Sequence, residues 1–447
     1  MSLGKYTIRF LPKKGYLAAG LALRLFLAPF LSHPFDMRVF MAVGAAVSKG
    51  ITPYGQYVLQ NIFAATPNPN LYGTVPGIGY PPLWGLICSD MYSLASALAS
   101  NNLYAYVFAL KIPIIIAELG TAVLIYNILK SQMNEKIAQK AFILFAFCPY
   151  IIAVGTVWGM FDIIAVFFAV ISACILYKNW ALSSVFLAVA SLLKVFPIIL
   201  APLYSILLYR STRDLKTVLG FSLFVVAIMG SFTLLPMVAY GWPTSNMYNA
   251  LSYQMVASSQ GYDHQASFPY GAASPFNVFT LANNFVAGGF QPPWILVYAW
   301  IPACIAVYIL LLRARMLVAV KEIGPTADLA VVVQWSLVLL LVFFTTRAWV
   351  SEQNLTFLFT FMALSVFIQN PQDIRDVRKL WLLLFAFVLI HVPVIAFFWM
   401  PFPWTLNAAT AFANGPFGWT RLLLMTLLTL GYLSLSWHYV VKKLRWW

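Results

Sequence analysis

The sequence has 447 residues, of which 62% are hydrophobic and only 9% are charged. A soluble domain carries about 25% charged residues, so this composition excludes an ordinary soluble protein. The net charge of +15 does not indicate a nucleic-acid partner, because the Lys and Arg residues lie between apolar segments, as the positive-inside rule predicts. We therefore expect an all-α polytopic membrane protein, with residues 1–447 forming a single integral membrane domain.

Apolar stretches of about 20 residues predict about twelve transmembrane helices. The basic N-terminus leads into the first stretch without an evident cleavage site, so we expect a retained span and not a signal peptide. Both termini are then expected on the cytoplasmic side. The predicted spans are 15–32, 104–129, 141–158, 160–177, 181–193, 196–209, 217–238, 292–312, 328–345, 354–369, 380–399 and 419–440.

Residues 80–99 decide the predicted topology. They are apolar, but they contain Asp90 and the pair Pro81–Pro82, which a lipid-facing helix tolerates poorly. We therefore predict a helix that lies at the outer interface. This choice places most of the 27 basic residues in cytoplasmic segments. Seven basic residues remain in spans or on the outer side: Arg24, Arg38, Lys49, Lys111, Lys194, Arg347 and Arg421.

Two long loops are expected on the outer side. The first covers residues 33–103 and contains the interfacial helices, and the second covers residues 239–291. The second loop is rich in Gly, Pro and aromatic residues and contains Asp263 and His264. Loops of this length are usually functional or disordered, and the abundant aromatic residues favour a folded cap at the lipid interface.

The few acidic residues can be weighed one by one, and Asp36 and Asp162 are the main candidates. Each lies where an outer loop meets a helix, so the two carboxylates can converge on one cleft. One carboxylate would remove a proton from a hydroxyl group while the other positions a ligand. Helix capping is the alternative for both. Glu118 lies inside a predicted span, where a carboxylate is either functional or part of a structural pair.

A second set of candidates is basic. Lys194 lies between two apolar segments, and Arg347 lies at the outer end of another span. A phosphate group at the membrane surface would form charge-assisted hydrogen bonds with both, whereas the alternative is snorkelling to lipid headgroups. His264 and Arg421 are further candidates. The four cysteines show neither metal-ligand nor disulfide spacing, and nucleotide-binding motifs are absent, which argues against a sugar-nucleotide donor and ATP-driven transport.

Four short motifs in order resemble the GT-C superfamily of polytopic glycosyltransferases. The similarity is to polyprenyl- or dolichyl-phosphate-mannose-dependent mannosyltransferases, which include the catalytic subunit of GPI mannosyltransferase I. The motifs are the outer-loop Asp36 with Gly50, Pro53 and Tyr54; Tyr80-Pro81-Pro82-Leu83; Trp158-Gly159 with Asp162; and Leu193-Lys194 with Pro197. Beyond about residue 210 the similarity depends on the span count and the outer segment from Arg347 to Gln353.

The resemblance implies an inverting transfer of a hexose, by family default mannose, on the extracytoplasmic side, either lumenal or at the cell exterior. The donor would be a polyprenyl- or dolichyl-phosphate sugar, and the acceptor a glycolipid or a glycan. Asp36 would be the catalytic base. No Asp-x-Asp surrounds Asp36, so neither a divalent metal nor another cofactor is expected. Residues expected to contact the donor or its phosphate are Lys194, Arg347, Asp162, His264, Arg38, Tyr80 and Gln353.

A secondary transporter or lipid flippase is the main alternative function, because about twelve spans are typical of many carriers. Such carriers usually show related halves with paired broken helices, and this chain shows no evident internal repeat. A non-catalytic partner in a membrane complex is the third possibility.

Overall fold

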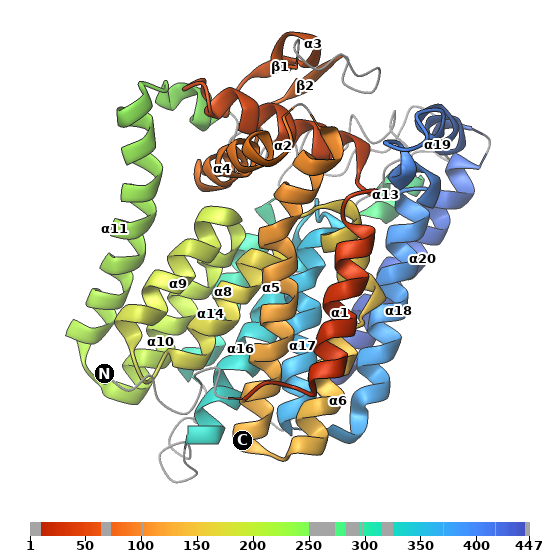
Figure 1. Cartoon of the computed structure of the whole chain (residues 1–447). Helices are drawn as coiled ribbons and strands as arrows, with labels where there is room; N and C mark the ends of the chain where they lie inside the picture. Colours follow the sequence, from red (N-terminus) through yellow and green to blue (C-terminus); the bar gives the residue numbers. More distant parts are fainter. Residues whose placement is uncertain are drawn as a thin grey trace.

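A computed structural model describes residues 10–63, 73–100, 102–249, 273–282, 296, 298–313, 325–369, 371–415 and 417–442. Nearly all of the regular structure in these ranges is helical, and the predicted all-α polytopic membrane fold is confirmed (Figure 1). In the described ranges, the only sheet pairs β1 (Gln56–Val58) with β2 (Thr74–Pro76) in an antiparallel arrangement.

Every one of the predicted spans contains a helix of the bundle. Among the described residues, five helices are long and apolar enough to cross a membrane, and several shorter apolar helices accompany them. The bundle consists of α1 (Lys14–Leu27), α5 (Leu103–Gln132), α6 (Glu135–Ala146), α8 (Asp162–Ile175), α9 (Trp180–Leu193), α10 (Leu200–Thr212), α11 (Leu215–Tyr240), α14 (Trp300–Arg313), α16 (Pro325–Thr346), α17 (Leu355–Gln369), α18 (Ile374–His391) and α20 (Gly418–Lys442).

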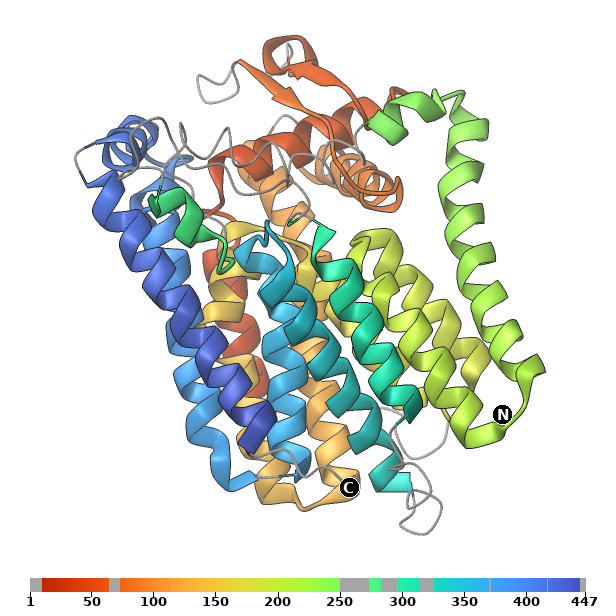
Figure 2. The same ribbon diagram turned by 180° about the vertical axis from the view of Figure 1, so that it is seen from behind.

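The elements of the first predicted outer loop gather at one end of the bundle (Figures 1 and 2). They include α2 (Pro34–Val47), α3 (Leu59–Ile62) and α4 (Leu83–Leu98), together with the small sheet. Helix α4 packs mainly against α2 and α5, and it lies with α2 across this end of the bundle in both views. The short helix α19 (Thr405–Asn414) lies at the same end, whereas the start of α1 and the end of α20 lie at the other.

In three predicted spans, a proline explains where the observed helix departs from the prediction. The span expected at 380–399 ends at His391, since Pro393 disfavours a helical conformation before it, and the 3₁₀ helix η7 (Val394–Phe398) follows. The span 141–158 is interrupted before Pro149, where α7 (Pro149–Ile152) begins and passes into the π-helix η1 (Ala153–Trp158). The span 196–209 begins with a 3₁₀ helix, Phe196–Ile199, that contains Pro197.

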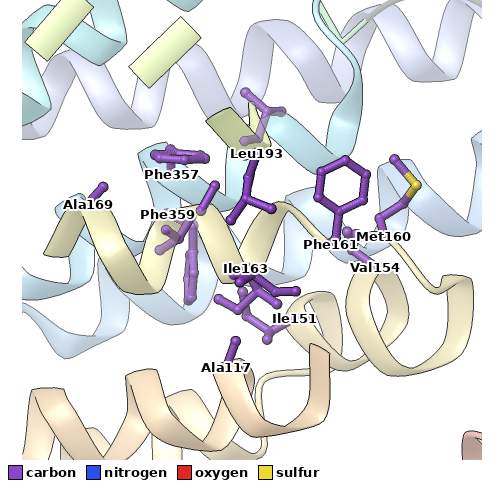
Figure 3. Close-up of a cluster of buried hydrophobic side chains, with 14 of the residues drawn as sticks. Ala117, Ile151, Val154, Met160, Phe161, Ile163, Ala169, Leu193, Phe357 and Phe359 are labelled. Atoms are coloured by element: carbon purple, nitrogen blue, oxygen red, sulfur yellow. The ribbon is translucent and has the colours of Figure 1, made fainter. Parts of the chain in front are cut away.

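Apolar side chains from several helices meet around η1 and the start of α8 (Figure 3). Phe161 and Ile163 lie close to Ile151 and Val154, and Phe357 and Phe359 of α17 approach from the other side. Lipid tails are as apolar as these side chains, so dispersion and close packing stabilise the cluster, with little gain from the hydrophobic effect. This packed interior gives η1 and the start of α8 a rigid base.

Helix α11 is the least buried of the long helices. Only 11% of its most apolar 18-residue window is buried, and Met237 is the single buried residue between positions 226 and 240. Its first half packs against α9 and α10. Just beyond its other end, Trp242 donates a hydrogen bond from Nε1 to the Gly50 carbonyl oxygen at 2.9 Å. Apolar side chains of α11 therefore face outward along most of the helix.

Gly44 allows α2 and α4 to approach closely. A Cβ atom at position 44 would overlap the Tyr106 hydroxyl and lie 2.5 Å from the Cys88 carbonyl oxygen of α4. Because a backbone atom cannot move aside cheaply, we predict that Gly44→Ala lowers the free energy of unfolding by about 1–3 kcal/mol. Gly230→Ala is the control, since nothing lies near its added Cβ. Thermal unfolding in detergent measures both, and equal stabilities of the two variants would contradict the proposed contact.

Candidate active site

Asp36 occupies the first turn of α2, and the local sequence explains why. Pro34 is favoured at the first helical position because its missing N–H is not needed there. His33 is the N-cap residue, and its Nδ1 lies 3.3 Å from the Asp36 backbone nitrogen. A carboxylate in the first turn is stabilised by the helix dipole. The Asp36 side chain remains 24% exposed.

Two donors converge on one oxygen of the Asp36 carboxylate. His33 Nδ1 lies 2.8 Å from Oδ2, and Trp158 donates from Nε1 to the same oxygen at 2.7 Å. The His33 and Trp158 rings stack with their centroids 4.4 Å apart. In the described part of the chain Oδ1 has no hydrogen-bond partner, so it is the oxygen that remains to accept a proton from a ligand.

The pKa of Asp36 lies below its ordinary value of 3.8. Burial raises the pKa of this carboxyl, but the charge of His33, the hydrogen bonds from His33 and Trp158, and the charge of Lys194 together lower it by more. Asp36 is therefore ionised at neutral pH. Its weak basicity is offset by a fixed orientation, because two donors hold the carboxylate in place.

Lys194, Asp162 and Tyr80 form a buried cluster beside this carboxylate. Lys194 follows α9 in an extended conformation, and its Nζ lies 3.1 Å from Asp162 Oδ2 and 3.1 Å from the Tyr80 hydroxyl oxygen. The ammonium group also lies over the rings of Tyr80 and Phe161, at 4.3 and 4.6 Å from their centroids. The Lys194 side chain is 5% exposed and that of Asp162 is fully buried, so the two charges compensate each other.

Aromatic residues connect Asp36 to this cluster. Phe40 lies one turn after Asp36 on α2, and its ring contacts both Phe161 and Trp84. Phe161 directly precedes Asp162 in the chain and stacks on Trp84. The structure therefore brings Asp36, Asp162, Lys194 and Tyr80 to the same end of the bundle. Within the described ranges Asp36 forms no ion pair with Lys194, although the Lys194 charge lowers the pKa of Asp36.

Arg347 lies just beyond the end of α16, with its guanidinium carbon 5.2 Å from the centroid of the Phe343 ring. Phe343 stacks on Phe196, which follows Lys194 by two residues in the chain. Burial lowers the pKa of Arg347 to about 10. In the described ranges its guanidinium has neither a hydrogen bond nor an ion pair. A partly desolvated cation without a counter-ion favours an anionic ligand.

The remaining predicted site residues have other surroundings. Gln353 in the 3₁₀ helix η5 (Glu352–Asn354) is 8% exposed, and its Oε1 has no hydrogen-bond partner among the residues that the structure describes. Arg38 donates from Nε to the Pro34 carbonyl oxygen one turn earlier on α2, at 2.7 Å. Buried Arg421 donates from Nη1 to the His391 carbonyl oxygen at 2.9 Å. His264 lies outside the described residues.

The capping alternative fails for Asp162 and holds only in part for Asp36. Phe161 is the N-cap of α8, and Asp162 makes no capping hydrogen bond to the helix. At α2 the N-cap residue is His33, while Asp36 supplies charge in the first turn. The two carboxylates therefore have different environments: that of Asp162 is neutralised by Lys194, and that of Asp36 is held by His33 and Trp158.

Several partners in the site were not predicted from the sequence. The i, i+3 spacing of His33 and Asp36 at a helix start is a signal that could have revealed their pairing. The Trp158 indole and the Glu352–His391 pair had no local signal, because each contact joins distant segments. His391 Nδ1 lies 2.6 Å from Glu352 Oε1, and its ring centroid is 6.3 Å from that of Trp158.

The described residues contain no group of three or more His, Cys, Asp or Glu side chains that could hold a metal ion. The absence of a metal requirement remains a prediction.

Comparisons with known proteins give no family assignment. No protein-family model matches the chain, and no curated protein matches it. Among solved structures, the crystal structure of ArnT from Cupriavidus metallidurans bound to undecaprenyl phosphate is similar, with a TM-score of 0.45 and 10% sequence identity. The alignment covers 96% of this chain and 77% of the ArnT chain. At this TM-score the similarity carries no conclusion about activity, so function is inferred from the site.

Removing Lys194 leaves the Asp162 carboxylate buried without a counter-ion. We predict that Lys194→Met lowers the free energy of unfolding by about 3–5 kcal/mol, and that adding Asp162→Asn recovers most of this loss. Thermal unfolding of the wild type, both single variants and the double variant forms a complete cycle. Equal effects of Lys194→Met in the presence and absence of Asp162 would contradict the ion pair.

The lowered pKa of Asp36 predicts how stability changes with pH. Because the folded-state pKa is below the unfolded-state value of about 3.9, the ionised carboxylate stabilises the fold above that value. This stabilisation is lost as the pH falls through the folded-state pKa. The stability difference between the wild type and Asp36→Asn should be constant from pH 7 to about pH 5 and should shrink below about pH 4. Thermal unfolding across this range measures it, and an unchanged difference at pH 3 would contradict the prediction.

Proposed function

We propose that this protein is an inverting glycosyltransferase that moves a hexose, with mannose as the first candidate, from a polyprenyl- or dolichyl-phosphate carrier to a glycolipid or glycan. The observation that carries the proposal is the Asp36 carboxylate, which is ionised, partly exposed and held by two donors on a single oxygen. An oriented carboxylate with one free oxygen is suited to accept a proton from an attacking hydroxyl group.

The proposed reaction is a single in-line displacement at the sugar C1. The acceptor hydroxyl transfers its proton to Asp36 Oδ1 while its oxygen forms the new bond to C1. The bond between C1 and the phosphate oxygen breaks, and the lipid phosphate leaves with the electron pair. Trp158 and His33 keep their hydrogen bonds to Oδ2 throughout, so the carboxylate needs little rearrangement when it accepts the proton.

Arg347 is the best candidate for stabilising charge on the leaving phosphate. Its guanidinium has lost part of its hydration and has no carboxylate partner among the described residues, so a phosphate oxygen would supply the missing acceptor. Lys194 is already neutralised by Asp162, and we assign it a supporting role through its field on Asp36 and the donor. The buried Gln353 amide and the Tyr80 hydroxyl are the proposed neutral contacts.

The polyprenyl tail of the donor would lie in the membrane beside α11. The second half of this helix exposes apolar side chains, among them Phe232, Leu234 and Val238, and its outer end is tied to the segment after α2 through Trp242. A lipid chain at this depth would keep the phosphate near the end of the bundle that carries Asp36. The positive-inside rule supports a cytoplasmic location for the opposite, Lys- and Arg-rich end, and we therefore propose that the site is extracytoplasmic.

An ion-coupled carrier fits the described residues less well. Such a carrier would need a carboxylate at mid-membrane depth that gains and loses protons, and Glu118 is the candidate that lies deep within a predicted span. Its side chain is fully buried and paired with Arg24, and it also accepts two hydrogen bonds from Thr156. A carboxylate with this many partners is poorly suited to repeated proton exchange.

Replacing the proposed base tests the function directly. We predict that Asp36→Asn lowers the rate of sugar transfer by about 10²–10⁴-fold, because the amide cannot accept the hydroxyl proton. Folding and donor binding should be unchanged. The assay follows transfer from radiolabelled mannosyl polyprenyl phosphate to host membrane glycolipids, together with release of free lipid phosphate. Asp90→Asn is the matched control, since Asp90 is an exposed acidic residue of α4.

Other lipid-phosphate hexoses and pentoses in the same assay would identify the sugar. Near-normal turnover by Asp36→Asn would refute the base assignment. Lack of transfer from every lipid-phosphate sugar by the folded wild type would refute the proposed function.

A further inference from the structure

Helix α5 carries two charged side chains that are fully buried within the membrane bundle. Lys111 and Glu118 are both 0% exposed, and their spacing of seven residues places them on the same face of the helix, two turns apart. Charged groups at membrane depth are costly and usually have a function. Lys111 and Glu118 are not each other's partners, and the proposed reaction gives neither a role.

Glu118 binds the π-helix η1. Its Oε1 accepts a hydrogen bond from the Thr156 N–H at 2.8 Å, and its Oε2 accepts one from the Thr156 hydroxyl at 2.8 Å. Oε2 also pairs with Arg24 Nε of α1. The approach requires glycine at position 155, because a Cβ atom there would overlap Glu118 Oε1. One carboxylate therefore joins α1, α5 and η1.

Lys111 binds the same two segments through backbone carbonyls. Its Nζ donates to the Ala28 and Val157 carbonyl oxygens, each at 3.1 Å, and also to that of Leu31. Ala28 and Leu31 follow the end of α1, and Val157 is the penultimate residue of η1. We call Lys111 and Glu118 the α5 clamp, because together they hold the end of α1 against η1.

The two clamped segments lead directly into the proposed site. The chain continues from Leu31 to His33 and Asp36, and from Val157 to Trp158. Where the segments meet, the His33 N–H donates to the Trp158 carbonyl oxygen at 2.9 Å. Gly159 then turns the chain away with a φ of 97°, a conformation that favours glycine. The relative position of Asp36 and the Trp158 indole is thus set by the segments that the clamp joins.

We propose that Lys111 and Glu118 are positioning residues for the catalytic base, holding the Trp158 indole in hydrogen-bond contact with Asp36 Oδ2. This inference rests on the proposed function. A π-helix is rare and occurs mostly as a short irregularity at functional sites, so external bonds are needed to keep η1 in this form. The α5 clamp provides these bonds from a long, well-packed helix. Lys111 and Glu118 then influence the orientation of the Trp158 indole and the Asp36 carboxylate, and neither contacts the substrate.

The protonation of Asp36 reports this positioning without any need for turnover. Carbodiimide reacts with protonated carboxyl groups, so labelling of Asp36 against pH, read by peptide mass spectrometry on the full-length protein, gives a midpoint. Trp158→Phe removes one hydrogen bond to the carboxylate and should raise this midpoint by about one pH unit. The other charged groups that act on Asp36 are His33, Lys194 and Asp162, and these variants leave all three in place.

Glu118→Gln should raise the labelling midpoint in the same direction as Trp158→Phe. The double variant should have a midpoint no higher than that of Trp158→Phe alone, because Glu118 acts through Trp158. Thr156→Val is the second variant, and it tests the same shift of the midpoint if Glu118→Gln does not fold. It keeps the Arg24–Glu118 pair and removes the hydrogen bond from the Thr156 hydroxyl to Glu118. Ser172→Ala is the control, because it breaks a buried hydrogen bond to Ser183 between α8 and α9.

Sugar transfer provides the second readout. Glu118→Gln and Thr156→Val should lower kcat with an unchanged KM for the donor, whereas Ser172→Ala should keep both the midpoint and kcat of the wild type. The inference is overturned if folded Glu118→Gln has the labelling midpoint of the wild type. If Glu118→Gln does not fold, the same result for folded Thr156→Val overturns it. An additive shift of the midpoint in the double variant of Glu118→Gln and Trp158→Phe also overturns it. Failure of the proposed function is a separate outcome: the wild type transfers no sugar, while the labelling midpoints still show whether the clamp acts on Asp36.

Discussion

The hydrogen bond from Trp158 to Asp36 joins two residues 122 positions apart in the sequence, and the proposed chemistry depends on it. A carboxylate at the end of a membrane bundle can turn toward water or lipid headgroups unless it is held. Here the stacked rings of His33 and Trp158 occupy one oxygen and leave the other available. Two helices position these rings: His33 follows the end of α1, and Trp158 is the last residue of η1.

Most of the buried charged side chains discussed above are compensated by a single oppositely charged side chain or by backbone carbonyl groups. Arg24 and Glu118 neutralise each other, Lys194 is paired with Asp162, and Lys111 is held by backbone carbonyls. Removing either member of such a pair leaves the other charge uncompensated in a medium of low dielectric constant, which costs more than the pair contributes. Arg347 differs from these groups among the described residues, because its positive charge lies at the end of α16 beside an aromatic ring without a carboxylate. This contrast supports the proposal that Arg347 binds the phosphate of the donor.

The sequence predicted the spans and part of the site for clear physical reasons. Apolar runs determine which segments are helical in lipid, and scarce charges at their ends mark Asp36, Asp162 and Lys194. The resemblance also assigned Tyr80 and Lys194 to one site, and the two side chains are hydrogen-bonded. Pairings between distant segments were not accessible: Lys111 is the cation nearest to Glu118 in the sequence, whereas the observed partner of Glu118, Arg24, lies 94 positions away. Helix irregularities were missed where an apolar run continues through proline, as at Pro149 and Pro393.

The exposure of α11 has a consequence for how the protein responds to its bilayer. With 26 residues the helix is about 39 Å long, which exceeds a hydrocarbon core of about 30 Å. Such a helix reduces the mismatch by tilting, and along its second half few protein contacts oppose a change of tilt. Thicker, sterol-rich membranes would bring α11 upright and thinner ones would incline it further, so membrane thickness sets the angle at which α11 meets the segment after α2.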